Sequence, residues 1–293
     1  MSKSQDIEIN PARRILRWES ALSGSIFTGT EKIRSGYGNG DCLFFDFYHR
    51  VFALADGSER FSRASREILS RLSQELSLNG VPGTAGEWKS LINSRIYPAQ
   101  KYQHKTTFSC VAIRGDENGI VLIIAHGGDS TVMVVDSENG EVLFQTDRNM
   151  VFAGRSQEIV DVIEYPVTSH NIRVIISSDG LEDLSRFCSR QLFPFHFPEA
   201  CVTLPVDRIC ERMERVLGEN SGLFEHDDIA LIALDPFQLF SMPARNVLIG
   251  GTQPYEEKLF RMGVGVGDLD LWVPHEIWAS AEMSFAVSGI TLH

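Results

Sequence analysis

The sequence from position 51 reads Val51-Phe52-Ala53-Leu54-Ala55-Asp56-Gly57. The apolar run predicts a buried strand, and the Asp-Gly pair predicts a turn at its end. Three further carboxylates lie beside apolar runs in the same way, at Asp129, Asp179 and Asp227. Carboxylates that converge at the ends of buried strands repel one another unless cations lie between them. The sequence therefore predicts an oxygen-only site for hard ions such as Mg²⁺ or Mn²⁺.

The composition narrows the class of protein. The chain has 293 residues and a net charge of −12, which argues against a nucleic-acid partner. Its five cysteines form no Cys-x-x-Cys pair, so a zinc site is not expected, and their apolar surroundings indicate reduced thiols. The N-terminus lacks an apolar signal core and no apolar run is long enough to span a bilayer, so we expect a cytoplasmic protein with no membrane partner.

The order of apolar runs predicts an α+β fold. Strand-like segments occur at 41–47, 51–55, 108–114, 120–125, 131–135, 159–165, 173–177 and 229–234. Asn-Gly loops at 118–119 and 139–140 indicate hairpins, and closely spaced hairpins indicate antiparallel sheets. Helical spacing is found at 61–76, after the capping box that starts at Thr84, and between Thr203 and Gly218. We expect a four-layer α-β-β-α sandwich, in which helices flank two antiparallel sheets.

The chain divides by composition near position 235. Residues 1–235 are predicted to form the main domain, and residues 236–293 a C-terminal extension of unknown role that packs on it. The extension has strand-like stretches at 246–251 and 263–273. Its large apolar side chains would not stay exposed to water.

The acidic positions and their neighbours resemble a known family over residues 23–234. The matching pieces, in chain order, are Asn39-Gly40-Asp41, Asp56-Gly57, Thr106-Thr107, Gly128-Asp129-Ser130, Ser178-Asp179-Gly180 with Asp183, and Asp227-Asp228. This set is similar to the metal-dependent protein phosphatases of type 2C, the PPM family of serine/threonine phosphatases, of the bacterial kind. Each piece alone is weak, but the ordered set is specific.

The resemblance implies a role for each position. Asp56 would bridge two metals with the Gly57 carbonyl as a further ligand, and Asp179 and Asp227 would complete the pair. Asp129 and Asp183 match positions that hold a third, weaker ion, and Asp41 would support the site. The resemblance thus implies two Mg²⁺ or Mn²⁺ ions, or three where the weaker site is also filled.

Some family positions differ in this chain. Gly40 stands where many members have an acid, and Ser58-Glu59-Arg60 follows the first Asp-Gly pair. The family's phosphate-binding arginine is replaced by Gly36, which leaves Arg34 as the candidate for that role. These departures affect the handling of the substrate more than the binding of metal.

The leading hypothesis is a phosphatase that acts on phosphoserine or phosphothreonine in proteins, with a role in signalling. The resemblance implies a two-metal-activated water as the nucleophile. One alternative is a phosphatase-like binding or regulatory module with weakened catalysis. Another is a phosphatase for a small phosphorylated metabolite. The sequence leaves the oligomeric state open.

Overall fold

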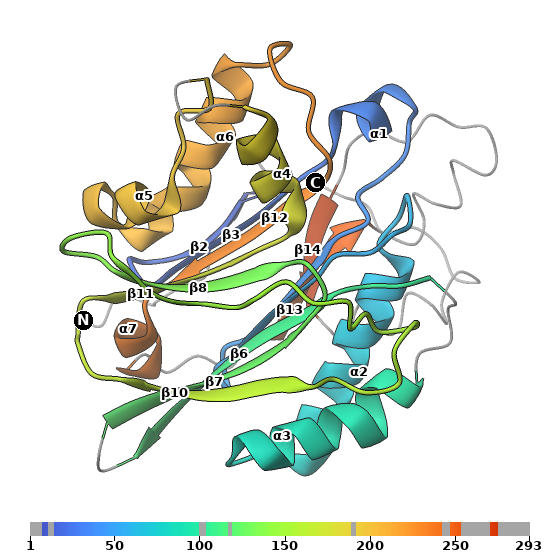
Figure 1. Ribbon diagram of the computed structural model, residues 1–293, viewed down its shortest axis with the longest axis vertical. Coiled ribbons are helices and arrows are strands. Elements are labelled where there is room, and N and C mark those ends of the chain that lie inside the picture. The colour runs from blue at the N-terminus through green and yellow to red at the C-terminus, as the bar shows by residue number, and fades with distance from the viewer. Residues whose placement is uncertain are drawn as a thin grey trace.

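The computed structural model describes residues 8–10, 15–99, 104–116, 119–188, 192–241, 247–252 and 270–274. In this part of the chain two antiparallel sheets of seven strands pack face to face, with helices on both outer faces (Figure 1). The prediction of a four-layer α+β sandwich is therefore confirmed. No helix among these residues has the length and apolar character needed to cross a membrane.

The first sheet combines the N-terminal strands with four later ones. Its order is β1 (Glu8–Asn10), β2 (Ile15–Trp18), β3 (Leu22–Phe27), β12 (Ile229–Leu234), β11 (Ile172–Ser177), β8 (Thr131–Asp136) and β9 (Val142–Gln145). The strand β12 is buried at every position because sheet neighbours cover its edges, the second sheet covers one face and helices cover the other.

The second sheet contains the strand quoted at the start. Its order is β10 (Asp161–Val167), β7 (Gly119–Gly127), β6 (Phe108–Asp116), β5 (Val51–Ala55), β4 (Cys42–Asp46), β13 (Val247–Thr252) and β14 (Asp270–Pro274). The apolar side chains between the two sheets form one core, which includes Phe45, Phe52 and Ile232. This core fixes the strand ends, and hence the loops that follow them.

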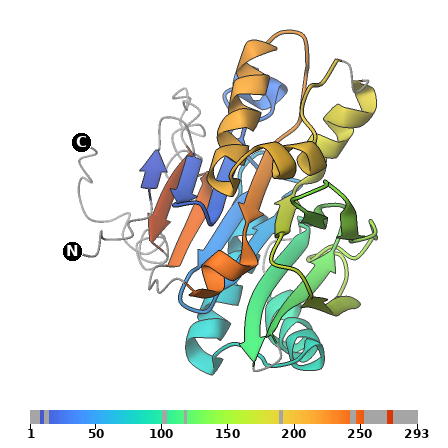
Figure 2. The ribbon, with the colours of Figure 1, turned by 90° about the vertical axis from the view of Figure 1, so that its left-hand side faces the viewer.

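Helices cover each sheet on its outer face. The long helix α2 (Arg63–Asn79) and α3 (Ala85–Leu91) pack on the second sheet, and α3 continues as π-helical Ile92–Ile96 and 3₁₀-helical Tyr97–Ala99. The helices α4 (Asp179–Phe187), α5 (Phe197–Thr203) and α6 (Ile209–Glu219) pack on the first sheet. Figure 2 shows α2 and α3 on the opposite side of the sheets from α5 and α6. The short helix α1 (Thr30–Arg34) follows β3.

The capping box at Thr84 is confirmed. The Thr84 hydroxyl accepts a hydrogen bond from the Glu87 backbone N–H, and the Glu87 carboxylate accepts one from the Thr84 N–H. Several predicted boundaries differ from the structure, and the two that matter most lie near prolines. The strand expected at 159–165 runs over Asp161–Val167 and includes Pro166, which is tolerated because β10 is an edge strand.

The helix expected from Thr203 to Gly218 is divided. Thr203 ends α5, Leu204 is extended before Pro205, and a 3₁₀ turn at Val206–Arg208 leads into α6. The residue before a proline avoids the helical conformation, which explains the break.

The region after position 235 supplies three of the described elements. The helix α7 (Pro236–Ser241) buries Leu239 in the core between the sheets. The strand β13 pairs with β4, with Ile249 opposite Phe44, and β14 pairs with β13. Residues 242–246, 253–269 and 275–293, including much of the predicted strand at 263–273, lie outside the described residues.

Candidate metal centre

Asp56 follows β5 and is fixed by two threonines from the segment that leads into β6. The Asp56 backbone N–H donates to the Thr107 hydroxyl at 2.8 Å, and its carbonyl accepts from the Thr107 N–H at 2.9 Å and from the Thr106 hydroxyl at 2.8 Å. Both threonines are buried. Thr106 and Thr107 therefore position Asp56, whereas the sequence pattern by itself indicates only that they pack in a strand.

Asp129 lies in the tight turn between β7 and β8. Gly128 has a φ of +111°, and a Cβ atom there would lie 2.7 Å from the Thr107 side chain. The turn is tied on both sides, because the Gly128 N–H donates to the Asn149 side chain and the Ser130 hydroxyl bonds to that of Thr107 at 2.7 Å. Asp129 and Asp56 are thus fixed to the same threonine.

Asp179 is the first residue of α4, directly after β11. Ser178 joins the ends of β11 and β12, because its hydroxyl accepts from the Ala230 N–H at 2.8 Å and its own N–H donates to the Ala230 carbonyl at 3.0 Å. A carboxylate in the first turn of a helix also interacts favourably with the helix dipole.

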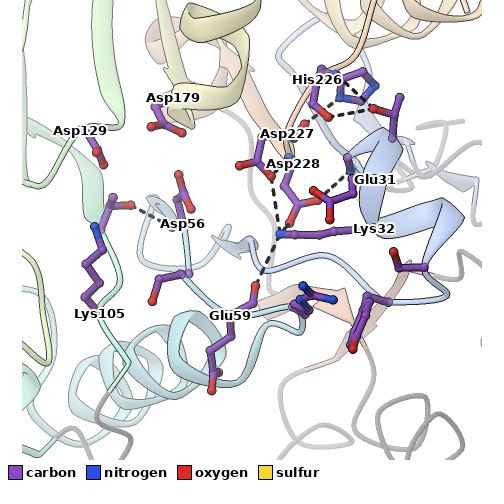
Figure 3. Close-up of a pocket in the computed structure, with 18 of the residues that line it drawn as sticks. Glu31, Lys32, Asp56, Glu59, Lys105, Asp129, Asp179, His226, Asp227 and Asp228 are labelled. Atoms are coloured by element: carbon purple, nitrogen blue, oxygen red, sulfur yellow. Dashed lines mark hydrogen bonds and ion pairs between the residues drawn. The ribbon is translucent and has the colours of Figure 1, made fainter. Parts of the chain in front are cut away.

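The structure brings these three carboxylates together. Asp56, Asp129 and Asp179 each offer an oxygen atom, and these atoms all lie within 4.8 Å of one another. Figure 3 shows the three side chains facing a common space. We call this group the acidic triad. Within the described part of the chain, no lysine or arginine forms an ion pair with any of its members.

The triad is electrostatically unfavourable as it stands. Burial raises the pKa of Asp56 well above its usual range, and the neighbouring Asp41 and Asp179 carboxylates raise it further. Burial and the nearby Asp129 raise the pKa of Asp179 to about 6. A bound cation would remove this repulsion, and carboxylate oxygens are the donors that Mg²⁺ and Mn²⁺ prefer.

Asp41 adds a fourth acid beside the triad. Its carboxylate is completely buried, and neither oxygen has a hydrogen-bond partner among the described residues. Burial and then the Asp228 carboxylate raise the pKa of Asp41 well above its usual range. An unpaired buried carboxylate is costly, so the surroundings of Asp41 fit a site that accepts a cation. The residues present therefore suit a divalent metal.

Asp227 and Asp228 lie on the other side of the same cleft, beside a lysine that the sequence did not point to. The Lys32 ammonium forms an ion pair with Asp228 and lies 3.7 Å from Asp227 Oδ1. Burial alone would lower the pKa of Lys32, but the surrounding carboxylates, chiefly Asp228 and then Asp41 and Asp227, together outweigh it, so the pKa is raised. Asp227, predicted as a metal ligand, lines the cleft with its side chain 73% exposed.

The remaining predicted positions are distributed as follows. Gly57 lines the cleft, whereas Asp183 lies one turn into α4 and contacts Arg148 at 3.6 Å and Arg186 at 3.5 Å. Arg34 pairs with Glu225 at 2.6 Å and is not among the residues that line the cleft.

Two other basic side chains line the cleft. Arg60 lies over the Tyr37 ring, 4.2 Å from its centroid, and Lys105 lies over the Phe152 ring at 4.3 Å. Arg60 was visible in the sequence as part of the unusual Ser58-Glu59-Arg60 loop. The only sign in the sequence that Lys105 would reach the cleft was its position directly before Thr106-Thr107.

Three solved structures resemble this fold. The PPM Ser-Thr phosphatase MsPP from Mycobacterium smegmatis, in complex with cacodylate, is 18% identical, covers 73% of this chain and 97% of its own, and has a TM-score of 0.53. The photosystem II phosphatase PBCP has the same four values. A bacterial serine phosphatase is 14% identical over 73% of this chain and 96% of its own, with a TM-score of 0.53.

No family model matches the sequence, and no curated protein matches it in sequence. The structural likeness nevertheless shows that this chain has the fold of the PPM, or type 2C, phosphatases. The family resemblance in the sequence is confirmed at the level of the fold. An acidic cluster suited to a metal occupies the ends of its strands.

Proposed function

We propose that this protein is a Mg²⁺- or Mn²⁺-dependent phosphatase that hydrolyses phosphoserine or phosphothreonine in proteins. The observation that carries the proposal is the convergence of Asp56, Asp129 and Asp179, beside the unpartnered Asp41, on a type 2C fold. The similar structures, which include a Ser-Thr phosphatase and a serine phosphatase, support the substrate class. A cytoplasmic location is part of this proposal, and the five free cysteines agree with a reducing compartment.

Individual residues have distinct roles in this proposal. Asp56, Asp129 and Asp179 would hold one metal ion, and the resemblance implies a second ion with Asp227 as a ligand. When bound, the metal supplies an activated water and neutralises charge on the phosphoryl oxygens. The hydroxyls of Thr106 and Thr107 keep the Asp56 backbone in place, so the carboxylate needs little rearrangement.

The phosphoryl group of the substrate requires a cationic partner. Arg60 and Lys105 line the cleft, and neither forms an ion pair within the described part of the chain. A guanidinium can bind two phosphate oxygens at once. We therefore assign phosphate binding to Arg60 in preference to Arg34, which pairs with Glu225.

This assignment predicts different effects for the two arginines. Arg60→Gln should raise the KM for a phosphothreonine peptide by about tenfold, because a charge-assisted contact to the substrate is lost. Arg34→Gln should leave KM close to the wild-type value. Steady-state kinetics with both variants decides between them, and equal effects would contradict the assignment.

The proposed activity is tested by phosphate release from a phosphothreonine peptide in the presence of Mn²⁺. Asp56→Asn and Asp179→Asn should each lower kcat/KM by about 100-fold or more, because a metal ligand is lost. Asp136→Asn is the matched control, since Asp136 ends β8 at the opposite end from Asp129. Full activity in both triad variants would refute the proposal.

The departures at Gly40 and at the loop after Asp56-Gly57 favour one second candidate. A phosphatase-like binding or regulatory module would use the same acidic cluster to bind a metal without turnover. The ion pair of Lys32 with Asp228 inside the cleft is consistent with weakened catalysis. Tight Mn²⁺ binding with no hydrolysis of any peptide in a phosphopeptide library would support this candidate over the enzyme.

A further inference from the structure

The acids of the cleft fall into two groups that differ in how their oxygen atoms are used. Within the described part of the chain, no lysine or arginine forms an ion pair with the acidic triad, and Asp41 beside it has no hydrogen-bond partner. Asp228 instead accepts hydrogen bonds from the Gly29 N–H at 2.8 Å and the Gly40 N–H at 2.6 Å, and pairs with Lys32. The oxygen atoms of Asp228, in the second group with Asp227, are thus already occupied by donors from the protein.

Lys32 is built into this second group and does not extend freely into solvent. Its side chain is 19% exposed, and its ammonium also lies 3.5 Å from the Glu59 carbonyl. The helix α1 that carries it is joined to the loop before β12, because the Thr30 N–H donates to the His226 carbonyl at 3.0 Å. The helix that carries Lys32 and the loop that carries Asp227 and Asp228 are therefore held together (Figure 3).

The backbone at position 40 keeps further acidic side chains out of this part of the cleft. A Cβ atom on Gly40 would lie 2.4 Å from the Gly57 carbonyl oxygen and 2.5 Å from that of Glu59. These contacts are with backbone atoms, which cannot turn aside as a flexible side chain would. No carboxylate can be supplied from position 40 without moving the loop that follows Asp56.

We infer that the Lys32 ammonium is a fixed cation that takes the place of a second divalent ion, so that the site binds one ion, at the acidic triad. A divalent ion beside Asp227 and Asp228 would have to overcome repulsion from the ammonium and displace it from Asp228. The triad offers three carboxylates that form no ion pair with Lys32. This inference rests on the proposed metal dependence and revises the number of ions that the family resemblance implies.

The test is the number of Mn²⁺ ions bound per chain, measured by isothermal titration calorimetry and by electron paramagnetic resonance of the full-length protein. The wild type should bind about one ion and show no exchange coupling between manganese ions. Lys32→Met, which keeps the length of the side chain but removes its charge, should bind about two. Lys32→Arg should bind about one, because the charge is kept.

A neutral side chain beside the buried Asp228 can impair folding, so Lys32→Gln is the second variant. Its amide still donates a hydrogen bond but carries no charge, and it should also bind about two ions. Two coupled ions in the wild type, or one ion in both neutral variants, would overturn the inference. A wild type that binds no Mn²⁺ would refute the metal dependence itself, whereas one bound ion without hydrolysis would refute only the proposed activity and support the inference.

Discussion

At the scale of single residues, the site is a set of negative charges held together before any cation is added. The triad carboxylates repel one another, and burial adds to the cost of keeping Asp56 ionised. The fold supplies the free energy that keeps them close, through the core that fixes the strand ends. Removing one charge should therefore help the metal-free protein while harming metal binding.

Asp56→Asn tests this balance. Without metal, the variant should melt a few degrees above the wild type, because one buried charge is gone. With Mn²⁺ in excess, the wild type should gain stability and the variant should gain much less, since ligand binding stabilises only the form that binds it. Thermal unfolding with and without Mn²⁺ measures both effects. An undiminished Mn²⁺ stabilisation in Asp56→Asn would show that Asp56 is no ligand.

Gly40 gives a second prediction at this scale. Gly40→Ala should destabilise the protein by about 1–3 kcal/mol, because its methyl group would overlap the carbonyls of Gly57 and Glu59. Gly218→Ala in α6 is the control, since no atom lies within 4 Å of its added Cβ and alanine favours the helix. Urea unfolding compares the two, and equal stabilities for both variants would contradict the crowding at position 40.

At the scale of elements, the buried strands beside the acids were the most predictable part of the molecule. The apolar runs before Asp56 and Asp179 and after Asp227-Asp228 became β5, β11 and β12, because each is buried almost throughout. The strands β2 and β3 were not predicted. Small and polar residues such as Ser23, Gly24 and Ser25 interrupt β3, so its sequence lacks an apolar run even though the strand is buried.

His126 on β7 makes the stability of this element sensitive to pH. The ring is buried between the Ser109 hydroxyl and the Asp147 carbonyl, each 3.1 Å away. Burial lowers the pKa of His126 below 6.5, although the Asp161 and Asp129 carboxylates oppose the shift. Below that pH the unfolded chain takes up a proton that the folded protein does not, so the free energy of unfolding should fall, by at most about 1.4 kcal/mol per pH unit.

The measurement is urea unfolding between pH 7 and pH 5 in a chelator, which keeps metal binding from contributing. His126→Gln can still donate to the Asp147 carbonyl but does not titrate, so it should lose less stability over this range than the wild type. The difference between the two proteins isolates the histidine from the carboxylates, whose raised pKa values act in the opposite direction. If the stabilities of the wild type and His126→Gln changed in parallel with pH, the proposed effect of His126 would be contradicted.

At the scale of the whole molecule, the sequence predicted the sandwich and the acids that meet in it, but not the partners of those acids. Asp56, Asp129 and Asp179 all lie at the ends of apolar strands, so their convergence at one end of the packed sheets could be expected from the sequence. Lys32 and Arg60 reach the cleft through loops and a short helix, whose paths depend on tertiary packing. No periodicity in the sequence carries that information.

The edge of the second sheet is another feature that the sequence pattern did not predict. The proposed division at position 235 falls between β12 and α7, yet β13 and β14 extend the second sheet beyond β4. The sequence showed apolar runs in this region without showing their partner strand. Pairing between segments about 200 residues apart is set by the packed core and leaves no local pattern.

The converging acids underlie the proposed metal-dependent phosphatase activity. Its most direct test is the initial rate of phosphate release from a phosphothreonine peptide by the full-length protein, measured with Mn²⁺ and again with excess chelator. We expect steady turnover with Mn²⁺ and a loss of about 100-fold or more in the chelator, restored when Mn²⁺ is returned. Hydrolysis that is equally fast in the chelator, or no hydrolysis by a protein shown to hold Mn²⁺, would contradict it.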